Sequence, residues 1–255
     1  SQDPAITARL LRQVNSAFFG FGGNIDRVSR AVSLMGSQQV HDLVLTTSVA
    51  QTFDGMSIEL MDMHAFWWRS VYCAVAARLL ATQSNVILNE RLFVIGLLRD
   101  IGHLIMYQSI PQESQQAIVQ AREYGKPLYT VERELIGFDY AKVGGALLEQ
   151  WGLPQSLWEP VKLHVTPDQS TSYRIETAII HMAGVLADVA DTQTDTDDLV
   201  SLVDPEAWLA TGVGLESYAA IRDEVDQQID DVLYLIFPHS KALHAGSHVR
   251  SECSA

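Results

Sequence analysis

The sequence predicts an all-α fold, a bundle of many helices, on three observations. Apolar residues recur every three or four positions through most of the chain, which is the spacing of one helical face. Glycines and prolines separate these periodic segments where helices end and begin. No segment alternates apolar and polar residues as a half-buried strand does, and no repeat of solenoid length is evident.

The N-terminal segment predicts three helices. The first covers Ala5 to Phe18, with apolar residues at helical spacing behind Pro4. The second ends at Gly36, and the third runs from the capping residue Ser37 towards Phe53. We therefore expect an N-terminal helical subdomain.

The remaining chain predicts helices of varied length. A long helix with several alanines allows neighbouring helices to approach closely, and an acidic, apolar-poor loop is expected at Asp191 to Asp198. The expected helices are His64 to Ala81, Phe93 to Gln108, Pro111 to Tyr124, Thr130 to Ile136, Phe138 to Trp151, Pro154 to His164, Ser172 to Ala190, one that starts at Asp204-Pro205-Glu206 and is stopped by Gly212, and Leu215 to Phe237.

The segment Phe93 to Gln108 is predicted to be the central helix, because it is apolar on nearly every side. It contains Arg99, Asp100 and His103, and the spacing places all three on neighbouring parts of one helical face. Buried charges need partners. Two interpretations stay open: the charges pair with adjacent helices and hold the bundle in register, or they form a functional site.

Composition excludes several function classes. The net charge of −14 repels phosphate backbones and anionic lipid, so we expect neither nucleic-acid nor membrane partners. Cys73 and Cys253 do not make a disulfide framework and favour a reducing compartment. No apolar run is long enough to span a bilayer and no leader is evident, so the sequence predicts a cytoplasmic protein.

Seven motifs occur in a fixed order: RLLRQVNSAFFG (9–20), AVSLMG (31–36), FWWRS (66–70), GLLRDIGHL (96–104), YAKVGGALLEQWGLP (140–154), KLHVTP (162–167) and HMAGVLAD (181–188). In this order and spacing the chain resembles the HDOD domain, the HD-related output domain of bacterial signalling proteins. The resemblance extends from Asp3 to about Ala190 and begins in the family's interior, so we expect one or two further helices before residue 1.

The resemblance implies an HD-domain-like bundle and four segments. We expect residues 1–60 to be the N-terminal helical part and residues 61–190 to be the HD-like core. Residues 191–238 are expected to add C-terminal helices, and residues 239–255 to form a flexible tail.

The resemblance also implies kinship with HD-type phosphohydrolases, including cyclic-di-GMP phosphodiesterases, which bind one or two metals through an H…HD…D pattern. Metal ligands must offer a lone pair, which a guanidinium lacks. The first histidine of that pattern falls on Arg69, and the histidine of the His-Asp pair falls on Arg99, with only Asp100 kept. Either arginine could supply the positive charge that the metal supplied.

Three further positions of the pattern complete the comparison. Two later histidines fall on Tyr140 and His164, and the final aspartate falls on Gly184. His103 and His181 lie nearby but not at ligand positions. Because only Asp100 and His164 survive, the resemblance implies a degenerate metal site, and we expect no catalytic residue, no bound metal and no cofactor.

Three functions remain open. We favour a non-catalytic signalling or regulatory module that acts through contacts with other signalling proteins or through a ligand bound in the vestigial cleft. The alternatives are a divergent phosphohydrolase using Asp100, His164 and His181 with an unusual metal, and a sensor that binds a nucleotide phosphate through Arg69 and Arg99. The candidate residues for a small-molecule ligand are Arg69, Arg99, Asp100, His103, His164 and His181.

Overall fold

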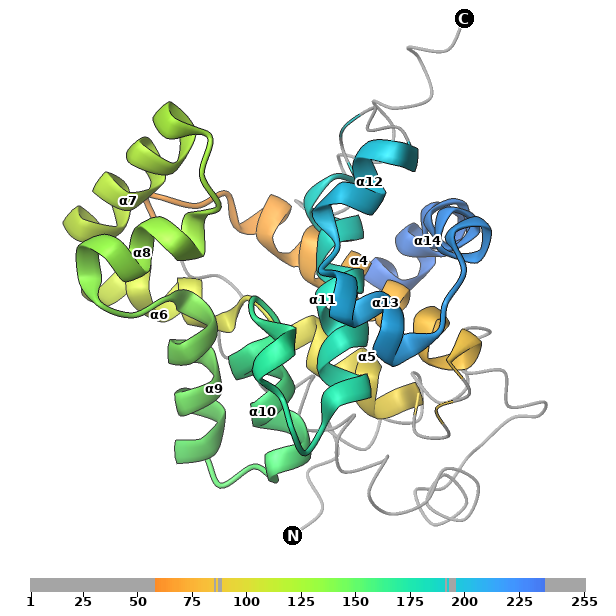
Figure 1. Cartoon of the computed structure of the whole chain (residues 1–255). Helices are drawn as coiled ribbons and strands as arrows, with labels where there is room; N and C mark the ends of the chain where they lie inside the picture. Colours follow the sequence, from red (N-terminus) through yellow and green to blue (C-terminus); the bar gives the residue numbers. More distant parts are fainter. Residues whose placement is uncertain (1–57, 85, 87–88, 191, 193–195, 237–255) are drawn as a thin grey trace, which may run out of the picture. The chain divides into compact units, whose positions relative to one another are not determined.

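Helices form every regular element in the part of the chain that the computed structural model describes, residues 58–84, 86, 89–190, 192 and 196–236 (Figure 1). The all-α prediction is therefore confirmed. The three predicted N-terminal helices and the predicted tail lie outside these residues. The helices are α4 (Met63–Gln83), α5 (Asn89–Leu98), α6 (Ile101–Ser109), α7 (Pro111–Tyr124), α8 (Leu128–Ile136), α9 (Tyr140–Gln150), α10 (Gln155–Leu163), the 3-10 turn η2 (Pro167–Gln169), α11 (Arg174–Asp188), α12 (Thr196–Leu202), α13 (Pro205–Thr211) and α14 (Leu215–Ile236).

The chain divides into two units, residues 57–223 and residues 1–56 with 224–255. The candidate site lies wholly in the first unit. The four segments expected from the sequence, 1–60, 61–190, 191–238 and 239–255, have other boundaries than these units. They stay predictions. No helix among the described residues is long and apolar enough to cross a membrane.

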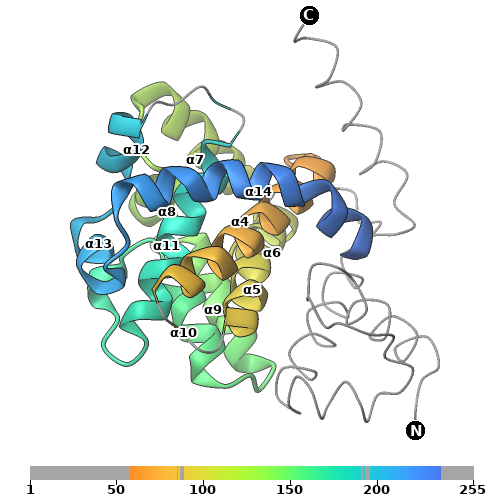
Figure 2. The ribbon, with the colours of Figure 1, turned by 90° about the vertical axis from the view of Figure 1, so that its right-hand side faces the viewer.

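Helices α4, α5 and α11 form the core of the 57–223 unit. Figures 1 and 2 show α4 beside α5 and against α11. The predicted close approach at the α4 alanines is confirmed, because Ala74, Ala76 and Ala77 are fully buried. A Cβ at Gly96 of α5 would lie 2.8 Å from the Cα of Ala74, so glycine is needed for this contact.

The expectation of one central helix over 93–108 is wrong, because a turn at Arg99 and Asp100 separates α5 from α6. Around the turn the backbone bonds span three residues, from Arg99 N–H to the Gly96 carbonyl at 3.4 Å and from His103 N–H to the Asp100 carbonyl at 3.0 Å. The break lets α5 pack on α4 while α6 packs on α9. At the second contact a Cβ on Gly102 would lie 1.9 Å from the Tyr140 carbonyl oxygen.

The helix ends follow the sequence signals. Asp139 caps α9 by accepting from the Lys142 N–H at 2.8 Å. Asp204 caps α13 in the same way, and Gly125 and Gly212 end α7 and α13 with φ of 61° and 65°. The acidic loop is shorter than predicted, because α12 begins at Thr196 and buries Leu199.

We predict that Gly102→Ala destabilises the domain by about 3 kcal/mol, since its methyl group would overlap the α9 backbone and neither helix can move without disturbing the core. Urea unfolding measures the change. Gly214→Ala is the matched control, because a Cβ there meets nothing within 4 Å. Equal stability of the two variants would show that α6 and α9 do not pack this closely.

Candidate functional site

The candidate site is built around the guanidinium of Arg99, which lies in the turn between α5 and α6. Its Nε donates to Asp100 Oδ1 at 2.9 Å, and its Nη2 donates to Asp100 Oδ2 at 2.6 Å. The same Nη2 donates to Asp188 Oδ1 at 2.8 Å. Arg99 is only 3% exposed and Asp100 7%, so these two charges form a buried pair, whereas the Asp188 side chain is 57% exposed. This charge network ties the turn to the C-terminal end of α11.

Gly184 provides the space that the Arg99 side chain occupies. A Cβ at this position of α11 would lie 2.1 Å from Arg99 Nη1. An aspartate at 184, where the phosphohydrolase pattern places one, would therefore displace the Arg99 guanidinium from this position. Asp188, one helical turn further along α11, supplies a carboxylate on the same helix instead.

The electrostatics keep Arg99 and Asp100 ionised. Burial raises the pKa of Asp100, but the Arg99 guanidinium outweighs burial and holds that pKa well below its usual range. Burial lowers the pKa of Arg99, and the carboxylates of Asp100 and Asp188 outweigh it and raise that pKa well above the usual value. Arg99 is thus a permanent cation between two anions.

His164 and Tyr140 form a second buried group beside the network. The His164 Nδ1–H donates to the Val161 carbonyl at 2.7 Å, which leaves Nε2 to accept from the Tyr140 hydroxyl at 3.1 Å. Burial, with a contribution from Arg99, lowers the pKa of His164 to about 3. The histidine is therefore neutral, and both ring nitrogens are engaged by the protein.

His181 has a capping role. Its Nε2 accepts from the Asp204 backbone N–H at 2.9 Å, at the start of α13, and its Nδ1–H donates to the His164 carbonyl at 2.8 Å. Burial lowers the pKa of His181. This imidazole joins α11 to the start of α13, and neither of its nitrogens is free for a ligand.

His103 and Arg69 lie at the edge of the site. The His103 ring stacks on Tyr140, with centroids 3.8 Å apart and planes at 21°. Arg69, on α4, is exposed and forms no hydrogen bond or ion pair with a described residue. Of the two arginines proposed as a replacement for the metal, only Arg99 pairs with Asp100.

The residues do not fit a metal centre. The Arg99 guanidinium stands between Asp100 and Asp188, where a dication would meet both carboxylates. His164 and His181 have no lone pair left to offer. Within the described ranges, no group of three or more His, Cys, Asp or Glu residues could hold a metal ion.

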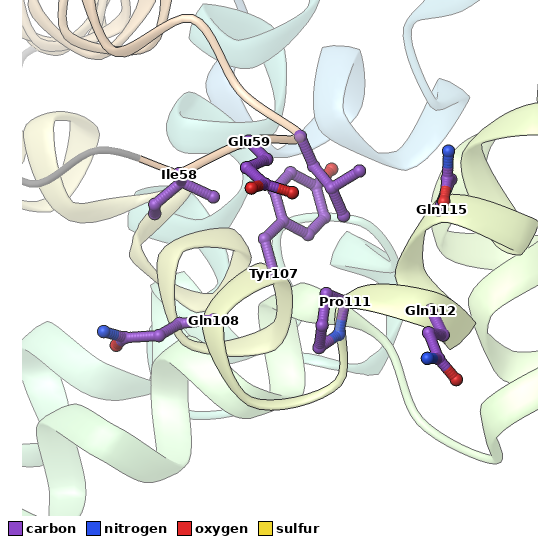
Figure 3. A pocket seen from close by; sticks show the side chains of 8 residues that line it. Ile58, Glu59, Tyr107, Gln108, Pro111, Gln112 and Gln115 are labelled. Atoms are coloured by element: carbon purple, nitrogen blue, oxygen red, sulfur yellow. The ribbon is translucent and has the colours of Figure 1, made fainter.

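A pocket is lined by residues outside the charge network (Figure 3). Its volume is about 430 Å³, and none of the predicted site residues lines it. Polar and apolar side chains share its wall, namely Ile58, Glu59, Leu60, Tyr107, Gln108, Pro111, Gln112 and Gln115. No motif in the sequence pointed to this pocket.

Comparisons with known proteins show the same fold. An HDOD domain protein of unknown function from Geobacter sulfurreducens superimposes with a TM-score of 0.71 at 19% identity, over 92% of this chain and 82% of that chain. A protein from Shewanella amazonensis that is proposed to be a phosphohydrolase gives 0.67 at 24% identity, over 89% and 79%. At these identities the likeness shows the fold alone.

The helical arrangement and these likenesses define an HD-like helical domain. Residues 1–167 match the HDOD domain family, and the chain belongs to that family. An uncharacterized protein of Treponema pallidum is 23% identical over 164 residues, which is 64% of this chain. The match spans about a third, 32%, of that relative.

We predict that Gly184→Ala costs about 3 kcal/mol of unfolding free energy, because the new methyl group displaces Arg99 from its two carboxylates. In an Arg99→Met background the same change should cost at least about 1 kcal/mol less, since no guanidinium is left to displace. Urea unfolding of the wild type, the two single variants and the double variant completes this double-mutant cycle. An equal cost in both backgrounds would mean that Gly184 does not serve Arg99.

Proposed function

We propose that this HDOD domain is a non-catalytic regulatory module of bacterial signalling, acting by binding other signalling proteins. The observation that carries the proposal is the Arg99 guanidinium held between Asp100 and Asp188. A tethered cation can fix the surrounding helices as a metal would. It has no coordination position for water, so it cannot generate the metal-bound hydroxide that hydrolysis needs.

The state of the histidines supports the proposal against a divergent phosphohydrolase. That alternative needs Asp100, His164 and His181 as ligands. Asp100 is bound to Arg99 through both oxygens, and each histidine uses both ring nitrogens within the protein. A metal would have to displace all of these bonds together.

We expect no phosphodiesterase activity from the purified protein with Mg²⁺, Mn²⁺ or Fe²⁺, because no water-activating centre can form around Arg99. The assay follows bis-p-nitrophenyl phosphate and cyclic dinucleotides, with metal content measured on the same sample. Turnover that co-purifies with the protein and is lost in His164→Asn would overturn the proposal. Activity unchanged in that variant indicates a contaminating hydrolase.

The two arginines are unlike each other as phosphate ligands. Arg99 is buried and its charge is shared by two carboxylates, whereas Arg69 is exposed. A nucleotide phosphate would have to compete with Asp100 for Arg99. This difference favours a protein partner over a nucleotide ligand.

We therefore expect cyclic dinucleotides and nucleoside triphosphates to leave the melting temperature unchanged. A thermal-shift titration measures this, with Arg69→Ala and Arg99→Ala tested in parallel. Saturable stabilisation that disappears in Arg99→Ala, itself confirmed to be folded, would support the nucleotide sensor instead. A pull-down from lysate of the source organism then identifies the protein partner.

A further inference from the structure

A second buried polar contact lies beside the charge network and is not part of it. Glu132, on α8, has no exposed side-chain surface, and its Oε2 accepts from the Tyr140 backbone N–H at 2.9 Å. Its Oε1 has no hydrogen-bond partner among the described residues, and neither has Nε2 of His103 on α6. These two atoms are 3.7 Å apart. Because a buried polar atom without a partner costs about 1–3 kcal/mol, each is the available partner for the other.

Aromatic rings restrict the His103 imidazole. Tyr140 stacks on one face at 3.8 Å, and the Tyr107 ring lies at 5.1 Å with a tilt of 33°. Rotation of the imidazole away from Glu132 would disturb this stack. The contact is thus set by packing as well as by hydrogen-bonding needs.

The charges around the pair decide where protons reside. Burial raises the pKa of Glu132 to about 7, against the opposing hydrogen bond from Tyr140. Burial lowers the pKa of His103 to about 4. The other titratable or charged groups that act on one or both members are Asp100, Asp139, Arg69, Arg99, Arg133 and Tyr107.

We propose that Glu132 and His103 form a proton-sharing pair that makes the junction of α6, α8 and α9 respond to pH. With a proton on Glu132, Oε1–H donates to the Nε2 lone pair of a neutral imidazole that carries its own proton on Nδ1. When the pair loses a proton, the carboxyl proton passes to Nε2 and the Nδ1 proton leaves to solvent, so the imidazole becomes the Nε2–H tautomer and donates to the carboxylate. One proton is released, and the direction of the hydrogen bond reverses.

The reversal reaches α9 through the second oxygen of Glu132. Oε2 holds the N–H of Tyr140, the first residue of α9, and the Tyr140 hydroxyl holds His164. A change of charge on Glu132 therefore acts at the start of the helix that supports the site. The pairing does not depend on whether the domain is catalytic.

Proton linkage gives the two members opposite effects on stability. Glu132 has its pKa raised from 4.5 to about 7, so its stabilisation is full below pH 4.5 and is lost as the pH rises to 7. His103 has its pKa lowered from 6.5 to about 4, so its stabilisation is present above pH 6.5 and is lost as the pH falls to 4. Where the two pH ranges overlap, Glu132 lowers the stability and His103 raises it as the pH increases. Removing the titration of Glu132 therefore leaves only the pH dependence that His103 contributes.

Glu132→Gln tests the proposal, because the amide keeps the shape of the side chain and does not titrate. The unfolding equilibrium constant of wild type, divided by that of the variant, should rise by about two orders of magnitude from pH 4.5 to 7. Urea unfolding at several pH values measures this ratio. Glu134→Gln, exposed on the same helix, is the matched control and should show no such trend. Indistinguishable trends for the two variants would overturn the proposal.

A direct measurement on the wild-type protein keeps the test independent of variant folding. Carbon-13 NMR of the Glu132 carboxyl should titrate near pH 7, and nitrogen-15 NMR of His103 should change from the Nδ1–H to the Nε2–H tautomer over the same interval. A carboxyl that titrates near 4.5, or an imidazole that keeps one tautomer, contradicts the shared proton.

Discussion

A buried guanidinium must be neutralised where it lies, and much of the described site depends on how Arg99 meets this requirement. Asp100 binds it through two oxygens from the same turn, and Asp188 binds it from α11. Asp188 is the last residue of α11, where the helix dipole disfavours an anion, and the arginine offsets that cost. One cation therefore stabilises the end of a helix and fixes the turn from which α5 and α6 diverge.

Glycines, which have no side chain, make this arrangement possible. Gly96, Gly102 and Gly184 all lie within helices, where glycine costs about 0.5–1 kcal/mol relative to alanine. Each is used for its lack of a Cβ, to admit the α4 backbone, the α9 backbone and the Arg99 guanidinium respectively. Gly96 and Gly102 therefore let the two helices that meet at the turn pack closely against different partners, α4 and α9.

The sequence predicted the helices well where periodicity and caps agree, as at α7 and α13, but it missed the break at Arg99 and Asp100. A segment that is apolar on every side does not indicate which face packs against which neighbour. Its sequence therefore does not show where the packing partner changes. Asp188 was missed because the metal pattern points to position 184. Position 188 is four residues later and lies on the same face of the helix. Glu132 was missed because VERELI has the composition of a surface helix, and only the fold shows that its side chain is buried.

A tethered cation differs from a metal in ways that bear on function. Metal binding depends on metal concentration and on deprotonated ligands, so a metal site is conditional. The guanidinium of Arg99 is part of the chain, and its surroundings raise its pKa further above the physiological range, so its charge is constant. The helices it joins are held together whatever metal is available. Constancy of this kind supports the proposal of a regulatory domain, because such a domain must present a stable surface to its partner, whereas hydrolysis needs an exchangeable position for water.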